Sequence, residues 1–435
     1  MLARLVARDF RNFAHLEVAV PTTGLAIIGE NGHGKTNLLE AVSYLSLLRS
    51  LRGARDVDVV RFGAPAFHIR AELLRTERSS DERAYADAAG STSDHASFDN
   101  IAVGYERSSK RKRATLDGVE QPRLTSALGA LPSVCFSPAD VSLVAGGPGE
   151  RRRFLDVVLA LSSRGYLLAL QQYRAALLRR NAVLRAMHRD GGRASAASAD
   201  KVSVWEPALA QHGGVIAALR QAFVLRHAAP FADIGAAIGE RARVTMRYVS
   251  TSASAADGSA LNAHAASVTA ANATTANATA ANTTTEHETS AAVNNDDLRA
   301  QSELQSRALS NAFAQQRAQE LRRGMTLVGP HRDELQLLLG GRELRTFGSA
   351  GQQRSAAIAL RLLELATLRE AIGSIPLLLL DDPFAELDAG RAARVLGLLE
   401  ASGIGQVLLA VPRIEDIPAA FTRLERRTMR DGALA

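Results

Sequence analysis

The chain has 435 residues, 46% hydrophobic and 5% aromatic, and a formal net charge of +7, which suits a helix-rich α/β protein of two or three domains with an anionic partner. Its single cysteine, Cys135, excludes an internal disulfide framework and any multi-cysteine metal site. No segment has the length of a membrane span or the apolar core of a leader, so we expect a soluble, cytoplasmic protein.

The first predicted elements are a β-hairpin and a strand that leads into a glycine-rich loop. Apolar and polar residues alternate from Leu2 to Val20, which predicts the hairpin. The apolar run 25–28 predicts a buried strand, and residues 37–42 continue as a helix. The loop between them has the spacing G-x-x-x-x-G-K-[ST] in the strand–loop–helix context that this motif requires.

This loop predicts a site for a nucleoside triphosphate. Its backbone N–H groups can surround anionic oxygens, and the following helix N-terminus adds a partial positive charge. Lys35 is expected to reach the β- and γ-phosphates, and the Thr36 hydroxyl to bind Mg²⁺. The residues predicted to bind the cofactor are Gly29, Glu30, Asn31, Gly32, His33, Gly34, Lys35 and Thr36.

A β-rich segment follows. Residues 67–73 and 101–105 are predicted strands, separated by a polar loop over 79–100. Asp117-Gly118 marks a tight turn beside the basic run 110–113. That run either lies on an exposed sheet edge and touches phosphates or is a solvated edge, and the sequence leaves both readings open.

From residue 149 to about residue 226 the pattern predicts helices. Apolar residues recur at spacings of three, four and seven from Tyr166 to Leu184 and again from Trp205 to Phe223, as in two amphipathic helices. Arginines occupy the opposite faces, either as a solvated surface or as one that tracks nucleic-acid phosphates.

The next segment interrupts the helices. Residues 243–248 alternate as a strand, and a further helix is expected over 296–323. Between them, the tract near 250–295 is almost wholly Ala, Thr, Asn and Ser. Such a tract cannot bury enough apolar area to offset its ordering entropy, so it predicts a disordered insertion without chemistry.

The second half of the nucleotide site is predicted near residue 380. The apolar run 375–380 predicts a buried parallel strand that ends in two carboxylates. Asp381 is expected to bind Mg²⁺ through its water shell, and Asp382 to orient or polarise the attacking water as the catalytic residue. Both carboxylates can stay ionised because the cation offsets their repulsion.

Two further motifs flank this strand. Residues 349–353 read Ser-x-Gly-Gln-Gln and open a long helix, whose start offers a hydroxyl, free N–H groups and a positive dipole end. Residues 385–388 read Ala-Glu-Leu-Asp. With the glycine-rich loop and the double acid, this order resembles the ABC-type ATPase head, an α/β fold with an inserted helical lobe. By this resemblance, five residues of one head are expected to contact ATP that is held by a second head: Ser349, Gly351, Gln352, Gln353 and Asp388.

Finer patterns resemble the RecF family over nearly the whole chain outside the insertion. They lie at 9–12, 29–41, 49–52, 136–144, 151–156 and 326–333. The resemblance implies an ATPase lobe over 1–148 and 324–435, and a helical lobe over 149–323.

The family also implies a function. Its members are ATP-dependent DNA-binding clamps of recombinational repair and replication restart, weak ATPases that form a homodimer on ATP. The resemblance implies binding to single-stranded or gapped duplex DNA, and help with RecA loading together with RecO and RecR, in support of the SOS response.

Some residues depart from the pattern. Ala410, Val411 and Pro412 stand where this family usually has a polar threonine run, and Ser137 stands near a glutamine that contacts Mg²⁺ in related heads. We therefore expect ATP binding and dimerisation with slow or absent hydrolysis. The His-x-Asp pair within 326–333 has no serine nucleophile beside it and is expected to be structural.

Four other functions share some of these features. A transporter ATPase subunit needs a much smaller helical insertion, and an SMC or Rad50-type architectural protein needs long heptad arms. A nuclease fused to the head needs a further acidic metal cluster, which the sequence does not show. A non-hydrolysing ATP-binding DNA scaffold differs from the RecF-like clamp only in turnover.

Overall fold

The computed structural model describes residues 1–74, 99–189, 196–252 and 295–435. The chain forms two compact units: the first contains 1–147, 229–245 and 338–435, and the second contains 148–228 and 246–337. The lobes predicted from sequence have different boundaries from these units, since residues 229–245 belong to the first unit and residues 324–337 to the second. Most of the predicted polar loop over 79–100 and of the insertion near 250–295 lies outside the described residues.

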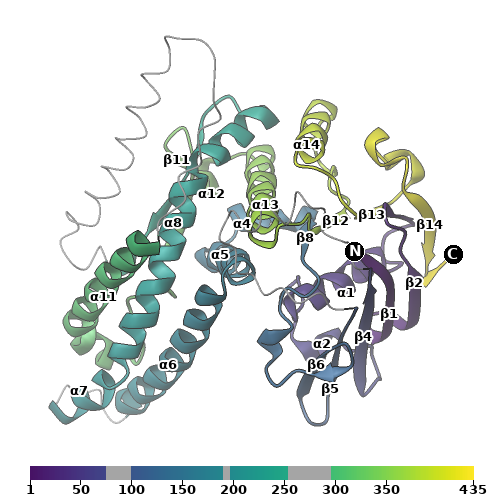
Figure 1. Cartoon of the computed structure of the whole chain (residues 1–435). Coiled ribbons are helices and arrows are strands. Elements are labelled where there is room, and N and C mark those ends of the chain that lie inside the picture. The colour runs from purple at the N-terminus through teal and green to yellow at the C-terminus, as the bar shows by residue number, and fades with distance from the viewer. Residues whose placement is uncertain (75–98, 190–195, 253–294) are drawn as a thin grey trace. The chain divides into compact units, whose positions relative to one another are not determined.

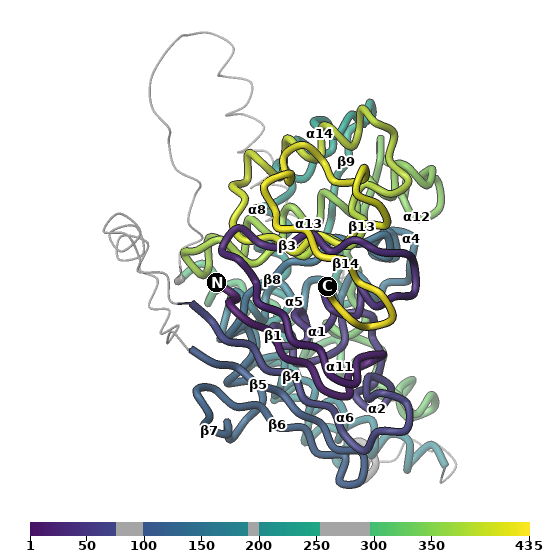
Figure 2. Tube along the Cα trace, turned by 90° about the vertical axis from the view of Figure 1, so that its right-hand side faces the viewer, coloured from purple at the N-terminus to yellow at the C-terminus, as the bar shows by residue number. Residues whose placement is uncertain are grey.

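The first unit contains an antiparallel sheet with the strand order β2-β1-β4-β5-β6-β7, and Figure 2 labels all of these strands except β2. The predicted hairpin is confirmed, because Leu5 pairs with Val18 in antiparallel register. The strands are β1 (Leu2–Phe10), β2 (Phe13–Ala19), β4 (Ala66–Leu73), β5 (Asn100–Glu106), β6 (Arg111–Leu116) and β7 (Val119–Glu120).

The second sheet of this unit has the order β15-β14-β3-β13-β12-β8, with β15 antiparallel and the other strands parallel. Because parallel strands end at one edge, the segments that follow β3, β12, β13 and β8 meet there. Three of these strands are apolar apart from the terminal Asp381 of one of them, as expected when both faces are covered. The strands are β3 (Gly24–Ile28), β8 (Ser133–Phe136), β12 (Leu377–Asp381), β13 (Val407–Val411), β14 (Glu425–Arg430) and β15 (Ala433–Leu434).

Helix α1 (Lys35–Leu47) packs against strands of both sheets and joins them into one core. Tyr44 on α1 makes edge-to-face contacts with Phe10 of β1 and Phe67 of β4. The other helices of this unit are α2 (Asp56–Val59), α4 (Ser142–Ala145), α12 (Leu344–Phe347), α13 (Ala350–Ile372) and α14 (Ala389–Ala401).

The second unit is built mainly of helices, and α6 contacts both α5 and α11; Figure 1 shows these helices together with α8. Its buried Arg180 forms ion pairs with Glu206 and Glu320, at 2.8 and 2.6 Å. The helices are α5 (Pro148–Ser162), α6 (Arg164–Arg189), α7 (Ala196–Ser203), α11 (Asn295–Arg323) and α8 (Glu206–Ile238), whose residues from 229 onward belong to the first unit.

Helix α8 is longer than the sequence predicted, because it continues past residue 226 and through Pro230. Phe231 and Ile238 are fully buried, so packing of this last part outweighs the hydrogen bond that proline removes. A three-stranded sheet has the order β11-β10-β9, from β9 (Val244–Val249), β10 (Glu334–Leu339) and β11 (Arg342–Glu343). Within the described ranges, no helix combines the length and apolarity needed to cross a bilayer.

Candidate nucleotide site

The glycine-rich loop follows β3 and ends at α1, and its glycines are required by the backbone. Gly32 and Gly34 have φ angles of 89° and 110°, which side-chain-bearing residues rarely adopt. At Gly29 a Cβ atom would lie 2.4 Å from the Met429 carbonyl oxygen of β14. The loop is therefore shaped both by left-handed turns and by close approach of a neighbouring strand.

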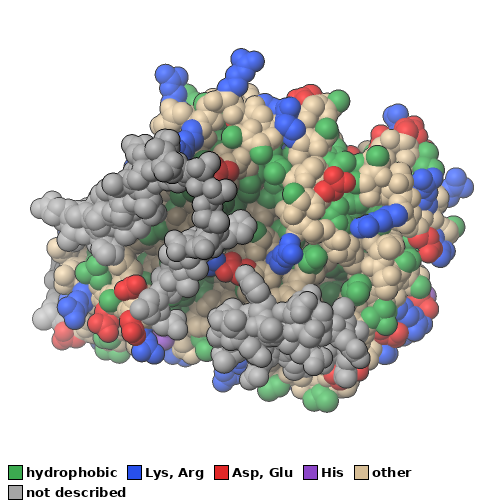
Figure 3. Space-filling view, turned by 45° about the horizontal axis from the view of Figure 1, so that its top comes forward, with side chains coloured by type: hydrophobic (Ala, Val, Ile, Leu, Met, Phe, Trp, Pro, Cys, Tyr) green, Lys and Arg blue, Asp and Glu red, His purple; other side chains and the backbone are tan. Residues whose placement is uncertain are grey.

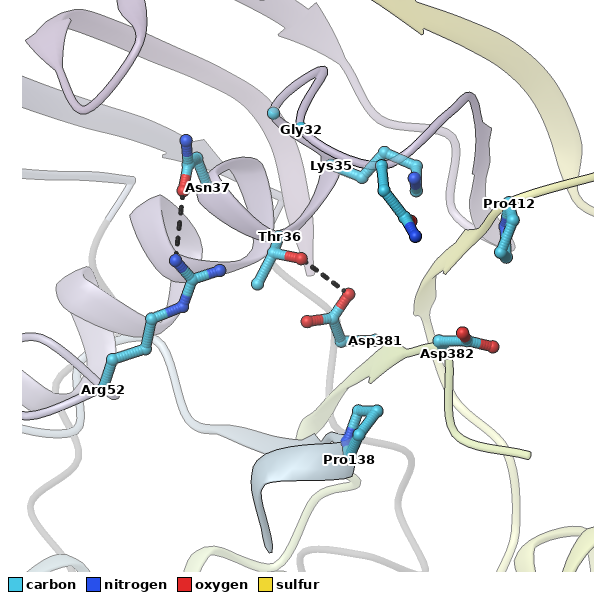
Figure 4. Close-up of a pocket in the computed structure, with 11 residues that line it drawn as sticks. Gly32, Lys35, Thr36, Asn37, Arg52, Pro138, Asp381, Asp382 and Pro412 are labelled. Carbon is cyan, nitrogen blue, oxygen red and sulfur yellow. Dashed lines mark hydrogen bonds between the residues drawn. The ribbon is translucent and has the colours of Figure 1, made fainter. Parts of the chain in front are cut away.

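Lys35 and Thr36 open α1 with their polar atoms turned in two directions. Lys35 Nζ donates to the carbonyl oxygens of Gly29 and Glu30, at 2.5 and 3.0 Å, and burial lowers the pKa of this ammonium. Thr36 Oγ1 donates to Asp381 Oδ1 at 2.9 Å (Figure 4). The two residues predicted to bind Mg²⁺ thus meet, although they are far apart in the sequence.

The two carboxylates lie at the end of β12. Burial raises the pKa of both Asp381 and Asp382, so a nearby cation would favour their charged forms. Asp382 has a φ of 46°, and its N–H donates to the Ala410 carbonyl oxygen at 2.9 Å. A hydroxyl and a buried carboxylate are hard oxygen ligands, which suit Mg²⁺.

These groups surround a pocket of about 410 Å³ at the edge where the parallel strands end (Figure 4). Arg52 and Asn37 were not predicted as site residues, yet both line it, and Arg52 Nη1 lies 3.5 Å from Asn37 Oδ1. The lining residues are Asn31, Gly32, Gly34, Lys35, Thr36, Asn37, Arg52, Pro138, Asp381, Asp382 and Pro412. Ser137 is not among them, and its N–H donates to Asp140.

Three of the predicted loop residues, Gly29, Glu30 and His33, do not line this pocket. His33 faces the β14–β15 turn instead. Its Nδ1 accepts the Asp431 N–H at 2.9 Å, and its carbonyl accepts the Gly432 N–H at 3.0 Å. His33 therefore fastens the loop to the β14–β15 hairpin in this structure.

The Ser-x-Gly-Gln-Gln motif forms the start of α13, and none of its residues lines the pocket. Ser349 is the N-cap: its Oγ accepts the Gln352 N–H at 3.3 Å, while Gln352 Oε1 accepts the Ser349 N–H at 2.9 Å. Gln353 donates to the Leu344 carbonyl at 3.0 Å. Asp388 is the N-cap of α14, where its Oδ1 accepts the Arg391 N–H at 2.8 Å, and it also lies outside the pocket lining.

A second, wider hollow of about 960 Å³ shares Asn37 and Arg52 with the first. Phe62 lines this hollow and is 95% exposed, whereas large apolar side chains in folded proteins are mostly buried. The remaining lining residues are Arg11, Asn12, Val57, Asp58, Val60, Arg61 and Arg107.

The 326–333 motif lies in the second unit and forms a closed hydrogen-bond network. Tyr173 OH bonds to His331 Nδ1 at 2.7 Å, and burial lowers the pKa of His331 to about 4. Asp333 accepts from Tyr248 OH at 2.5 Å and from the Thr251 N–H and hydroxyl, both at 2.8 Å. Because these groups already hold partners, the contacts support a structural role for the His-x-Asp pair.

The basic run 110–113 is largely paired with acids. Arg111 and Arg113 lie 3.3 and 3.7 Å from Glu120, and Lys112 lies 2.7 Å from Asp56. Because these charges are already paired, the contacts favour a solvated sheet edge over a phosphate-binding one for this run. Figure 3 shows that Lys and Arg side chains on the visible face are also dispersed among acidic and hydrophobic ones.

The glycine-rich loop, the acid-tipped strand and the mixed sheets define an α/β P-loop protein with the architecture of an ABC-type ATPase head. A sequence profile described as the RecF/RecN/SMC N terminal domain matches residues 1–415. The chain belongs to the RecF family.

Individual relatives agree over nearly the whole chain. "DNA replication and repair protein RecF" of Salinibacter ruber (strain DSM 13855 / M31) is 33% identical over 95% of this chain and 85% of its own. The RecF protein of Chloroflexus aurantiacus (strain ATCC 29364 / DSM 637 / Y-400-fl) is 33% identical over 97% and 96%. The solved structure of the recombination mediator protein RecF with ATP in the RecFOR pathway has a TM-score of 0.74, with 24% identity over 100% of this chain and 96% of that one.

Proposed function

We propose that this chain is an ATP-dependent DNA-binding clamp of recombinational repair and replication restart. Two copies close on ATP, bind DNA at gaps or single-stranded regions, and help RecA to load together with RecO and RecR, in support of the SOS response. The names of the relatives, DNA replication and repair proteins of the RecF type, support this proposal.

The observation that carries the proposal is the separation of two sets of residues within one unit. The pocket contains the loop, Thr36 and the acid pair, whereas Ser349 and Asp388 lie outside its lining. Ser349 is exposed, and the Asp388 side chain is 66% exposed. A capped helix start directed to solvent suits an anion brought by another molecule, so the partner that fits is a second copy with ATP in its pocket.

Within one copy, each residue has a distinct role. Lys35 and the loop N–H groups hold the phosphates, and Thr36 and Asp381 would hold Mg²⁺, which supplies charge neutralisation when bound. Asp382 is proposed to orient the attacking water. The base and sugar fit the second hollow, where Phe62 offers an aromatic face and arginines surround it.

Turnover is proposed to be slow, so the chain acts as a weak ATPase. Pro412 lines the pocket and Ala410 gives Asp382 only a backbone carbonyl, so residues 410–412 supply no polar side chain to hold a water. DNA recognition is proposed to rely on phosphates and shape, because no base-reading motif is present.

The test is the molar mass in solution with and without ATP, repeated with short gapped DNA. The wild-type chain should dimerise with ATP and bind DNA more tightly when it does. Lys35→Arg should abolish both effects, because a broad guanidinium replaces a compact ammonium among the loop carbonyls. Lys201→Arg, at an exposed lysine of α7, is the matched control. A monomeric wild-type chain at saturating ATP would refute the clamp.

A further inference from the structure

One arginine contacts both elements that are proposed to act on the second copy. Arg391 lies in the first turn of α14. Its Nη1 lies 2.7 Å from the position that a Cβ on Gly351 would take, and its Nε lies 3.6 Å from Asp388 Oδ2. The guanidinium therefore packs over the glycine of the Ser-x-Gly motif while it faces the cap of α14.

The same guanidinium reaches a buried carboxylate just beyond the end of α8. Arg391 Nη2 lies 3.2 Å from Oε1 of Glu240, whose side chain is only 3% exposed. Burial of a carboxylate is strongly unfavourable unless a cation compensates it, so this pair resists separation. One turn further along α14, Arg394 Nε donates to the Ile238 carbonyl at 2.8 Å. Two arginines thus fasten the segment 238–240 to α14.

We propose that Arg391 is a positioning residue that holds the start of α13 and the start of α14 as one rigid block. The buried Glu240 carboxylate forms an ion pair with the guanidinium, Gly351 leaves room for it, and Asp388 lies beside it. Ser349 and Asp388 then reach the nucleotide of a second copy together. This inference rests on the proposed function, because only a shared site uses both elements.

The inference predicts different results for ATP binding by a single copy and for dimerisation. Arg391 does not line the nucleotide pocket, so ATP binding by a single copy should not depend on it. We expect Arg391→Gln to bind ATP as a monomer with wild-type affinity, but to raise the dimer dissociation constant at saturating ATP by about tenfold or more. Arg391→Lys keeps the charge but lacks the planar guanidinium. Its dimer dissociation constant should therefore lie between those of the wild type and Arg391→Gln.

The matched control is Arg369→Gln, at the other end of α13. Arg369 donates to the Ser402 carbonyl and should leave dimerisation unchanged when replaced. If the wild-type chain does not dimerise, the proposed function fails. If the wild type dimerises and Arg391→Gln does so equally well, only the positioning role fails.

Mixing two defective variants distinguishes positioning from loss of folding. Lys35→Ala lacks a working loop but keeps the α13–α14 block, and Arg391→Gln has the opposite defect. A mixed dimer regains one complete site, from the loop of the Arg391→Gln copy and the block of the Lys35→Ala copy. We expect the mixture to dimerise with ATP more tightly than either variant does alone. A mixture that dimerises no more tightly than Arg391→Gln alone would overturn the positioning role.

Gly351 offers an independent check. A methyl group added there would displace the Arg391 guanidinium, so Gly351→Ala and Arg391→Gln should weaken dimerisation through the same defect. The double variant should then be no worse than the more affected single variant. Effects that multiply would show that Gly351 acts separately from Arg391 and would count against the block.

Discussion

The neutral state of His331 makes the stability of the second unit depend on pH. Its pKa is about 4 in the folded chain, against 6.5 for an unperturbed histidine. Between these two pH values the unfolded chain binds a proton at this histidine and the folded chain does not. The free energy of unfolding therefore falls as pH decreases from 6.5 towards 4. Linkage between these two pKa values gives a loss of about 2 kcal/mol between about pH 7.5 and about pH 5.

The assay is urea unfolding followed by the fluorescence of Trp205, the single tryptophan of the chain, which lies in the second unit. His331→Gln is the reference variant, because an amide can accept from Tyr173 and donate to the Thr326 carbonyl without titrating. The wild type should lose about 2 kcal/mol more than the variant between the two pH values. Equal losses would refute a buried neutral histidine.

Three further changes test the site and the helical unit. Asp156→Ala leaves the buried Arg220 without its carboxylate, 2.7 Å away, and should cost about 3–5 kcal/mol in urea unfolding; a loss below about 1 kcal/mol would contradict this. Ser349→Ala removes the cap of α13 and should cost about 1 kcal/mol by thermal unfolding, while monomer affinity for ATP stays unchanged; weaker monomer binding would count against action on a second copy. Thr36→Val should remove the Mg²⁺ dependence of ATP binding measured by calorimetry, and a retained dependence would reject this ligand.

Local patterns in the sequence were sufficient for the elements that carry the nucleotide loop. The strand and helix predicted around it are β3 (Gly24–Ile28) and α1 (Lys35–Leu47), because apolar runs and glycine spacing are properties of neighbouring residues. The long helix after Ser349 and the strand that ends at Asp381 are confirmed for the same reason.

Features that depend on distant segments could not be predicted. Arg52 lines the pocket because the chain after α1 turns back towards it, and no local period marks that turn. The sequence also gave no sign that His33 bonds to residues of the β14–β15 hairpin. Helix α8 continues through Pro230 because its last residues are buried, which is a tertiary effect that outweighs local propensity.

The β14–β15 hairpin supports the glycine-rich loop, so nucleotide affinity depends on a segment near the end of the sequence. His33 and Asp431 are separated by 398 positions, yet one hydrogen bond joins them, and the Met429 carbonyl limits what residue 29 can be. A proteolytic cut between β13 and β14 would leave every phosphate ligand intact. It would nevertheless break the covalent link between β13 and the hairpin that supports one side of the loop, so ATP binding would weaken although every residue of the pocket lining is still present.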